Sequence, residues 1–136
     1  MKISNVLACA SVALFAAVLA FAQTTKLSVQ IENPKDGSTV SEIATVSGTV
    51  SDPQADVFLV VHPTANGDYW VQQSPTVGDD GKWMATAHFG QGSRGVGEVF
   101  EVRAFVGPND NLNRDQKLSN WPSAKARSNV VRVTRR

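Results

Sequence analysis

Few side chains in this sequence could carry out catalysis. Its two histidines are His62 and His88, and no serine occupies the G-x-S-x-G turn that exposes a hydrolase nucleophile. A hydrolase triad needs a nucleophile, a histidine base and a carboxylate within mutual reach. The single cysteine, Cys9, lies in an apolar N-terminal stretch. The sequence therefore predicts no catalytic residues, and we expect a protein that is not an enzyme.

Metal ligands are equally sparse. A blue-copper site requires a cysteine, and His62, His88 and Asp68 could supply only half of a zinc or copper site without any recognisable ligand spacing. We therefore expect no metal ligands and no cofactor. From Asn109 to Asp115, oxygen-bearing side chains occupy alternate positions, as in a calcium loop. Because this segment lacks the central glycine and the bidentate glutamate of an EF-hand, a solvated loop is favoured, with calcium left open.

Aromatic side chains are the stronger candidates for function. Tyr69, Trp70, Phe105 and Trp121 could stack on sugar rings or pack on a partner protein, because aromatic groups give large contact areas and Tyr and Trp add a polar atom. Tyr69 and Trp70 are adjacent, so in a strand they point to opposite faces. We expect these four residues to form the binding surface, and Trp83 to lie in the core.

The segment from residue 57 to residue 106 must position these aromatic groups. It contains short runs rich in Val, Phe, Tyr, Trp and Thr, each closed by Gly, Pro, Asn or Asp, a pattern typical of antiparallel strands. Alternation places one set of side chains inward, namely Trp83, Phe89, Phe100 and Val102. Together with runs before and after it, the chain has about seven predicted strands, at residues 26–32, 44–51, 57–62, 69–73, 83–89, 98–106 and 129–134.

Three connecting or terminal segments stand out. Residues 90–97 contain four glycines in eight positions, which predicts a mobile loop at one end of the domain. Residues 107–126 form a long polar connection, which is either functional or partly disordered. The basic end formed by Arg132, Arg135 and Arg136 is interpreted as a solvated tail.

The N-terminal residues 1–22 have the features of a secretory signal peptide. Lys2 supplies a positive charge, an apolar run follows, and Ala20-Phe21-Ala22 fits a cleavage site. Lipidation at Cys9 is disfavoured because the apolar run before it is too short, and a retained anchor is disfavoured because the segment is barely long enough to span a bilayer. We expect a cleaved signal peptide and a periplasmic or extracellular protein.

Cleavage would remove Lys2 and Cys9 and leave one disulfide-free domain, residues 23–136. Of the 13 basic side chains 12 would remain, against 12 acidic ones, so the formal net charge would be zero. This balance gives no basic field for nucleic acid and no polybasic patch for a membrane. A domain of this length can bury enough surface to fold without disulfides.

Residues 31–52, IENPKDGSTVSEIATVSGTVSD, contain a Pro-x-Asp-Gly turn followed by a Val-x-Gly strand, and the runs W-V-Q, G-K-W and F-E-V-R-A come later in the chain. In these features the sequence resembles the opening, middle and end of the immunoglobulin-like domains of bacterial secreted and surface proteins. The resemblance implies an all-β fold, an immunoglobulin-like antiparallel β-sandwich of about seven strands. It carries no catalytic signature, and the inter-sheet cysteine pair of antibody domains is missing.

We therefore expect an exported, non-catalytic binding or structural module that recognises a protein partner or glycan through loops and exposed aromatic residues. It would be a monomer or associate weakly, with no nucleic-acid or membrane partner after signal cleavage. One alternative is a structural subunit that assembles through exposed edge strands. A small hydrolase or metal-binding protein is the least favoured alternative.

Overall fold

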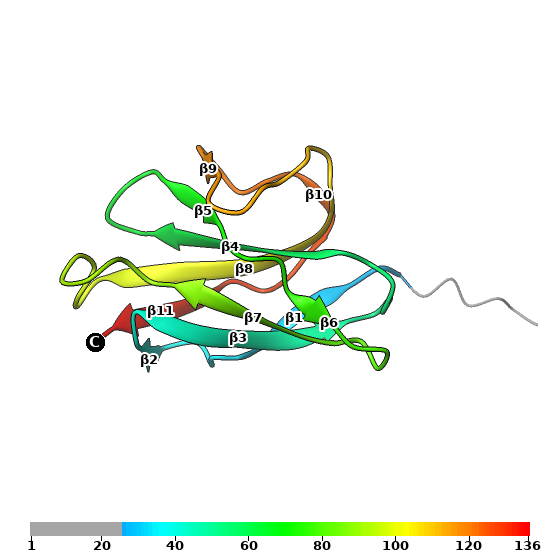
Figure 1. Ribbon diagram of the computed structural model, residues 1–136, viewed down its shortest axis with the longest axis horizontal. Coiled ribbons are helices and arrows are strands. Elements are labelled where there is room, and N and C mark those ends of the chain that lie inside the picture. Colours follow the sequence, from blue (N-terminus) through cyan, green and yellow to red (C-terminus); the bar gives the residue numbers. More distant parts are fainter. Residues whose placement is uncertain (1–25) are drawn as a thin grey trace, which may run out of the picture.

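A computed structural model describes residues 26–136, so the expected signal peptide and Cys9 lie outside the described part of the chain. This part contains eleven strands and no helix (Figure 1). The strands are β1 (Val29–Asn33), β2 (Ser38–Val40), β3 (Ile43–Val50), β4 (Val57–Pro63), β5 (Tyr69–Val71), β6 (Thr76–Val77), β7 (Lys82–His88), β8 (Val99–Pro108), β9 (Lys117–Leu118), β10 (Ala124–Arg127) and β11 (Val131–Arg135).

The strands form two sheets that pack together. One sheet has the order β1-β3-β7-β6, and the other has the order β2-β11-β8-β4-β5-β9, with β10 also paired to β8. All strand pairs are antiparallel except β2 with β11, which are parallel. The expected all-β architecture is confirmed. The chain has more strands than the seven expected, because short runs in its connections also pair.

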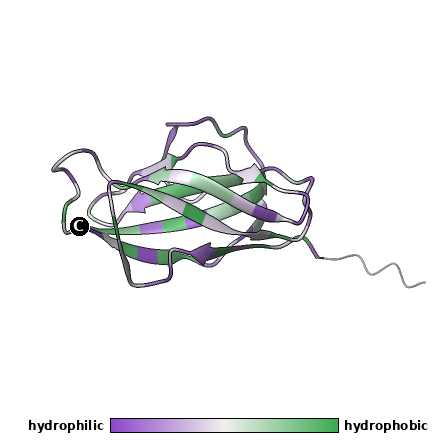
Figure 2. Ribbon diagram, turned by 60° about the horizontal axis from the view of Figure 1, so that its bottom comes forward, coloured by the Kyte–Doolittle hydropathy of each residue, from purple (hydrophilic) through white to green (hydrophobic). Residues whose placement is uncertain are grey.

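The core between the sheets contains the inward set expected from the sequence. Trp83 is 2% exposed, and Phe89, Phe100 and Val102 are likewise buried. Alternation is visible in Figure 2, where green and purple segments follow one another along strands. On β7 the burial pattern is strictly alternating, with Trp83 at the first inward position. The period of two in the sequence is therefore the property that builds this core.

Gly48 in β3 shows why that strand contains a glycine. Gly48 pairs with Trp83 of β7, and a Cβ atom added at Gly48 would lie 2.8 Å from the Trp83 ring and would collide with the carbonyl oxygen of Gln30. A glycine inside a strand is typical of such a close approach.

A second, smaller hydrophobic cluster lies on the other face of the β8 sheet. Val60, Val71 and Phe105 form its buried part, and the side chains packed against them are Phe58, Tyr69, Leu112, Leu118, Trp121 and Ala124. Several of these belong to the long connection of residues 107–126, which also contributes β9 and β10. The connection thus folds back over the sheet and covers it.

The free edge of β1 is closed by a side chain. The Asn129 carboxamide accepts a hydrogen bond from the Ile31 N–H at 3.0 Å and donates one to the Ile31 carbonyl at 3.4 Å. These two hydrogen bonds resemble those of a neighbouring strand, and they occupy backbone groups with which another chain could otherwise pair.

Residues 26–136 contain no helix long and apolar enough to cross a membrane.

Candidate binding groove

The four aromatic residues proposed for binding do not form one surface. Phe105, Tyr69 and Trp121 lie together in the second hydrophobic cluster, whereas Trp70 points to the opposite face of its strand. The sequence predicted that Tyr69 and Trp70 diverge, and this is confirmed. Phe105 does point away from the main core, but it is 0% exposed. The expectation that Phe105 belongs to an exposed binding surface is therefore wrong, because the long connection of residues 107–126 covers this side chain.

Tyr69 and Trp121 belong to a stacked aromatic group. The rings of His62 and Tyr69 are parallel, with centroids 3.9 Å apart, and the Trp121 ring meets Tyr69 edge to face at 4.8 Å. His62 is fixed further by a 2.8 Å hydrogen bond between its Nδ1 and the carbonyl of Asp68. Tyr69 and Trp121 are half-buried. This packing holds the long connection against the sheet, so the aromatic group stabilises the fold.

Arg103 borders the same cluster. Its guanidinium carbon lies 6.0 Å from the centroid of the Phe105 ring, and its Nε donates to the carbonyl of Ser128 at 2.8 Å. Burial of the guanidinium, together with the nearby charge of Arg127, lowers the pKa of Arg103. Arg103 therefore packs against Phe105 and bonds the main chain at Ser128.

Trp70 lines a groove of about 390 Å³ on the other side of the sheet. One wall comes from β5 and the β4–β5 hairpin, and the facing wall comes from the end of β7 and the glycine-rich loop after it. The lining residues are Val61, Pro63, Asn66, Asp68, Trp70, Gln72, His88, Gly90, Gln91, Arg94, Phe100 and Asp115. The volume falls within the range of small-ligand sites, which begin at about 300 Å³.

The floor of the groove is held by Gln72, which is buried. Its side-chain oxygen accepts a hydrogen bond from the main-chain N–H of His88 at 2.8 Å, and its nitrogen donates to the carbonyl of Trp70 at 3.1 Å. Gln72 therefore connects the two sheets where the groove runs between them. One side chain thus links the main chains of Trp70 and His88, which lie on opposite walls.

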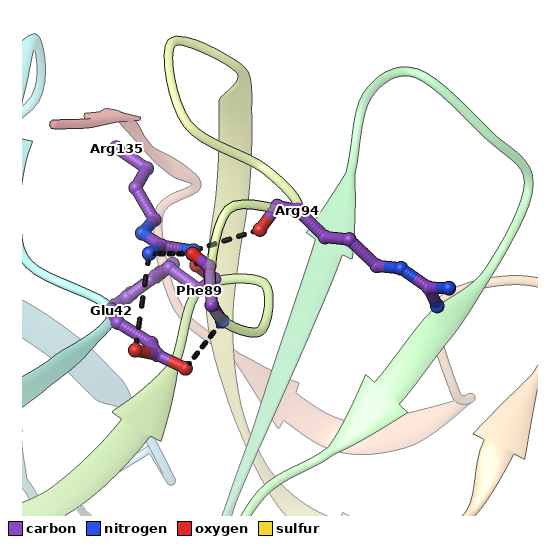
Figure 3. A network of polar contacts seen from close by, with 5 residues as sticks. Glu42, Phe89, Arg94 and Arg135 are labelled. Carbon is purple, nitrogen blue, oxygen red and sulfur yellow. Dashed lines mark hydrogen bonds and ion pairs between the residues drawn. The ribbon is translucent and has the colours of Figure 1, made fainter.

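The glycine-rich wall is held by a buried arginine. Arg135 is 5% exposed, and its Nη1 donates to the carbonyls of Phe89 at 3.0 Å and Arg94 at 2.8 Å (Figure 3). Its Nη2 donates to the carbonyl of Gly92 and lies 3.9 Å from a carboxylate oxygen of Glu42. This corrects the expectation that Arg135 belongs to a solvated tail.

Glu42 completes this network from the other end of the loop. Its second carboxylate oxygen accepts a 2.8 Å hydrogen bond from the N–H of Gly92. Gly90 has a φ of 80°, and a Cβ there would lie 2.9 Å from Arg135 Nη1, so only glycine admits the guanidinium. The loop was expected to be mobile, but its carbonyls have specific partners that hold it in one shape.

Arg94 itself faces away from this network. Its backbone is tied to Arg135 and to Gln91, while its exposed side chain extends toward the hairpin of β4 and β5 (Figure 3). Asp68 and Asp115 line the same groove from the other side. The groove thus presents the exposed ring of Trp70, hydrogen-bonding amides and charges of both signs.

A second hollow, of about 650 Å³, lies at the start of the long connection. Asp52, Asp56 and Asp110 are among the residues that line it, together with Asn111 and Asn113. In residues 26–136 no three His, Cys, Asp or Glu side chains are grouped so that they could hold a metal ion. This hollow also lacks a tryptophan or tyrosine, so the groove around Trp70 is the better candidate.

The two histidines lie in different parts of the fold, and His88 is the one that lines the groove. The Nδ1 of His62 is engaged with a main-chain carbonyl, and His88 lies on the other sheet. Sequence inspection missed Glu42, Gln72 and Arg135, whose importance depends on contacts between distant segments. The sequence signals for this region were Trp70 and the glycines at residues 90–97.

Comparison of the chain with protein-family models and with curated proteins gives no match. The candidate site therefore rests on the geometry of this chain alone.

Proposed function

We propose that this protein is an exported, immunoglobulin-like recognition module without catalytic activity, which binds a glycan or a protein partner in the groove around Trp70. The strand orders support the immunoglobulin-like assignment. The order β1-β3-β7-β6 corresponds to the A-B-E-D sheet of that fold, and β11-β8-β4 corresponds to G-F-C. The buried tryptophan differs in position, since Trp83 lies on β7 rather than on the strand equivalent to C.

The exposure of Trp70 carries the proposal. In residues 26–136 the exposed large apolar side chains are Ile43, Trp70, Met84, Val96 and Val99, and Trp70, 37% exposed, is the aromatic one. It lines the groove described above together with several polar groups. Tryptophan in such a setting is the residue type that most often dominates binding energy.

Assembly through edge strands is the alternative, and the edges do not favour it. The outermost strands β2, β6 and β9 have three, two and two residues. The longer edge strand, β1, has Asn129 bonded to the backbone of its central residue, Ile31. Short or capped edges are the means by which proteins prevent strand addition.

Binding by wild-type and variant proteins tests the proposal. The purified protein is applied to a glycan array and used for pull-down from the compartment to which it is exported, alongside Trp70→Ala, Trp121→Ala and Met84→Ala. We expect Trp70→Ala to lose the interaction, while the control Met84→Ala, at an exposed site on the outer face of the other sheet, retains it. Trp121→Ala should weaken binding less than Trp70→Ala does, because it acts only by loosening the connection that carries Asp115. Equal binding by Trp70→Ala and wild type would refute the proposal.

Two further measurements address the remaining parts of the proposal. Cell fractionation and N-terminal sequencing would locate the protein and its cleavage site, expected after residue 22. Size-exclusion chromatography and electron microscopy should show monomers or small assemblies, whereas long polymers would favour the edge-strand alternative.

A further inference from the structure

We propose that the ligand of the groove is a neutral saccharide, one ring of which stacks on the indole of Trp70. This inference rests on the recognition function proposed above and adds the chemical class of the ligand. It follows from four features of the groove: the aromatic wall, the size, the mixture of charges and the fixed loop.

The aromatic wall suits a pyranose ring. Trp70 projects from β5, a strand of three residues, into the groove, and more than a third of its surface remains exposed to solvent, at 37%. The ring face of a sugar carries several C–H groups, and these pack on the electron-rich face of an indole. The two apolar floor residues, Val61 and Phe100, are buried and offer little further apolar surface.

The size of the groove matches a short saccharide. Its volume of about 390 Å³ is near the lower limit for small-molecule sites, which suits about one or two sugar rings. A lipid would need a larger and more apolar enclosure. The groove is bordered instead by the polar side chains of Asn66, Gln91 and Arg94.

The mixture of charges favours a neutral ligand. An anionic ligand would approach Arg94 but would also meet the carboxylates of Asp68 and Asp115. A cationic ligand would approach these carboxylates but would also meet Arg94, and the exposed His88 lines the groove as well. A hydroxyl group donates one hydrogen bond and accepts two, so a neutral polyol can satisfy carboxylates, amides and a guanidinium together. Hydrogen bonds from charged groups to hydroxyls are also stronger than neutral ones.

The fixed loop lowers the cost of binding. Arg135 and Glu42 already bond the loop carbonyls and the Gly92 N–H, so little backbone freedom remains to be lost when Gln91 and Arg94 contact a ligand. Binding sites gain affinity when their groups are ordered in advance. This is most useful for saccharides, because their hydroxyls are well solvated and yield little net energy per contact.

An extended peptide fits the groove less well. Peptides that bind by strand addition need a free sheet edge with unpaired N–H and C=O groups. The edge of β5 is already paired with β9, through Tyr69 with Leu118 and Trp70 with Lys117. The groove therefore has no strand edge to offer along the Trp70 wall.

Nuclear magnetic resonance titration of the purified protein would test this inference. The probes are three sets of soluble oligosaccharides of equal length: neutral hexose oligomers, uronic-acid oligomers and amino-sugar oligomers. The indole N–H signals of Trp70, Trp83 and Trp121 report on the groove, the core and the outer cluster. We expect a neutral oligosaccharide to shift the Trp70 signal and to leave the Trp83 signal in place.

Variants then assign the contacts. Trp70→Ala should weaken the affinity for the neutral oligosaccharide about tenfold, the upper range for one aromatic contact. Arg94→Gln, which keeps hydrogen-bonding capacity but removes the charge, should weaken it by about twofold to fivefold. Met84→Ala and Arg127→Gln serve as matched controls at exposed positions outside the groove and should bind as wild type.

The other outcomes separate this inference from the proposed function. Trp70-dependent binding of uronic-acid or amino-sugar oligomers alone would overturn the neutral ligand and keep the recognition function. The absence of binding to every saccharide would overturn the inference, and the function would stand only if a protein partner bound in a Trp70-dependent manner. Neutral saccharide binding that is unchanged in Trp70→Ala would refute the site itself.

Discussion

Arg135 donates a 2.8 Å hydrogen bond to the main-chain carbonyl of Arg94, so the penultimate residue of the chain holds the loop that forms one wall of the candidate groove. The same guanidinium also bonds the carbonyls of Phe89 and Gly92 and lies 3.9 Å from Glu42. The planar guanidinium of Arg135 thus donates hydrogen bonds to several main-chain carbonyls of the loop. The arrangement holds the main chain of Arg94, from which the exposed side chain extends.

Replacement of Arg135 by lysine should loosen the glycine-rich loop. A single ammonium group cannot reproduce the fork of donors that reaches Phe89, Gly92 and Arg94, so buried carbonyls lose their partners. We expect the free energy of unfolding to fall by about 1 to 3 kcal/mol. Urea denaturation measures this loss, and hydrogen exchange at the Gly92 N–H should become faster.

The matched control is Arg132→Lys. The Arg132 side chain is 67% exposed and pairs with Glu101 at the surface, so its replacement should change stability by less than about 0.5 kcal/mol. Equal stability of Arg135→Lys and Arg132→Lys would show that the buried network contributes little.

Gly48→Ala should be strongly destabilising. The new methyl group would collide with the Gln30 carbonyl and the Trp83 ring, which belong to the neighbouring strands β1 and β7. We expect a loss of about 3 kcal/mol or more, since two sheet strands would have to move. Gly67→Ala is the control, because nothing lies within 4 Å of its added Cβ. Thermal unfolding of both variants decides the matter, and a similar melting temperature for the two would contradict the steric argument.

Asn129→Ala should expose the edge of β1. Both backbone groups of Ile31 lose their partner, and we expect a loss of stability of about 1 to 2 kcal/mol. Self-association should also increase, because an open edge can pair with another molecule. Chemical denaturation and size-exclusion chromatography at several concentrations measure the two effects. The exposed Asn111 gives the control variant Asn111→Ala, and an Asn129→Ala protein that matches it in both measurements would argue against a capping role.

Trp121→Ala should release the long connection from the sheet. The variant loses the edge-to-face contact with Tyr69 at 4.8 Å and the contact with Phe105 at 5.9 Å. We expect a stability loss of about 1 to 3 kcal/mol and faster hydrogen exchange at the Asp115 N–H, which bonds the Val71 carbonyl at 2.8 Å. Trp70→Ala, the control at an exposed tryptophan, should leave this exchange unchanged. Slow exchange in both variants would mean that the connection is held by its backbone bonds alone.

Local patterns in the sequence were sufficient for the strands and for the main core. Trp83, Phe100 and Val102 were identified as inward because side chains in a strand alternate, and alternation is a property of neighbouring residues. The expected strands at residues 44–51, 57–62 and 83–89 match β3, β4 and β7 within one or two residues.

The site was predictable only in part. Trp70 was named as a binding residue and lines the groove, whereas Phe105 was also named and is buried beneath the long connection. Alternation indicates which face a side chain takes, but it does not show whether another segment covers that face. The fate of Phe105 depended on how residues 107–126 fold back, which no local pattern records.

What the sequence by itself determined, then, is the all-β character, the turns and the inward side chains, because each of these depends on residues a few positions apart. Only the tertiary structure decided that Arg135 is buried, that Glu42 and Gly92 meet beside it, and that Trp70 shares a groove with Arg94. These residues come together through strand pairing between distant segments. The physical reason is that burial and partnership are properties of the packed sheets, and they exist only after the sheets have formed.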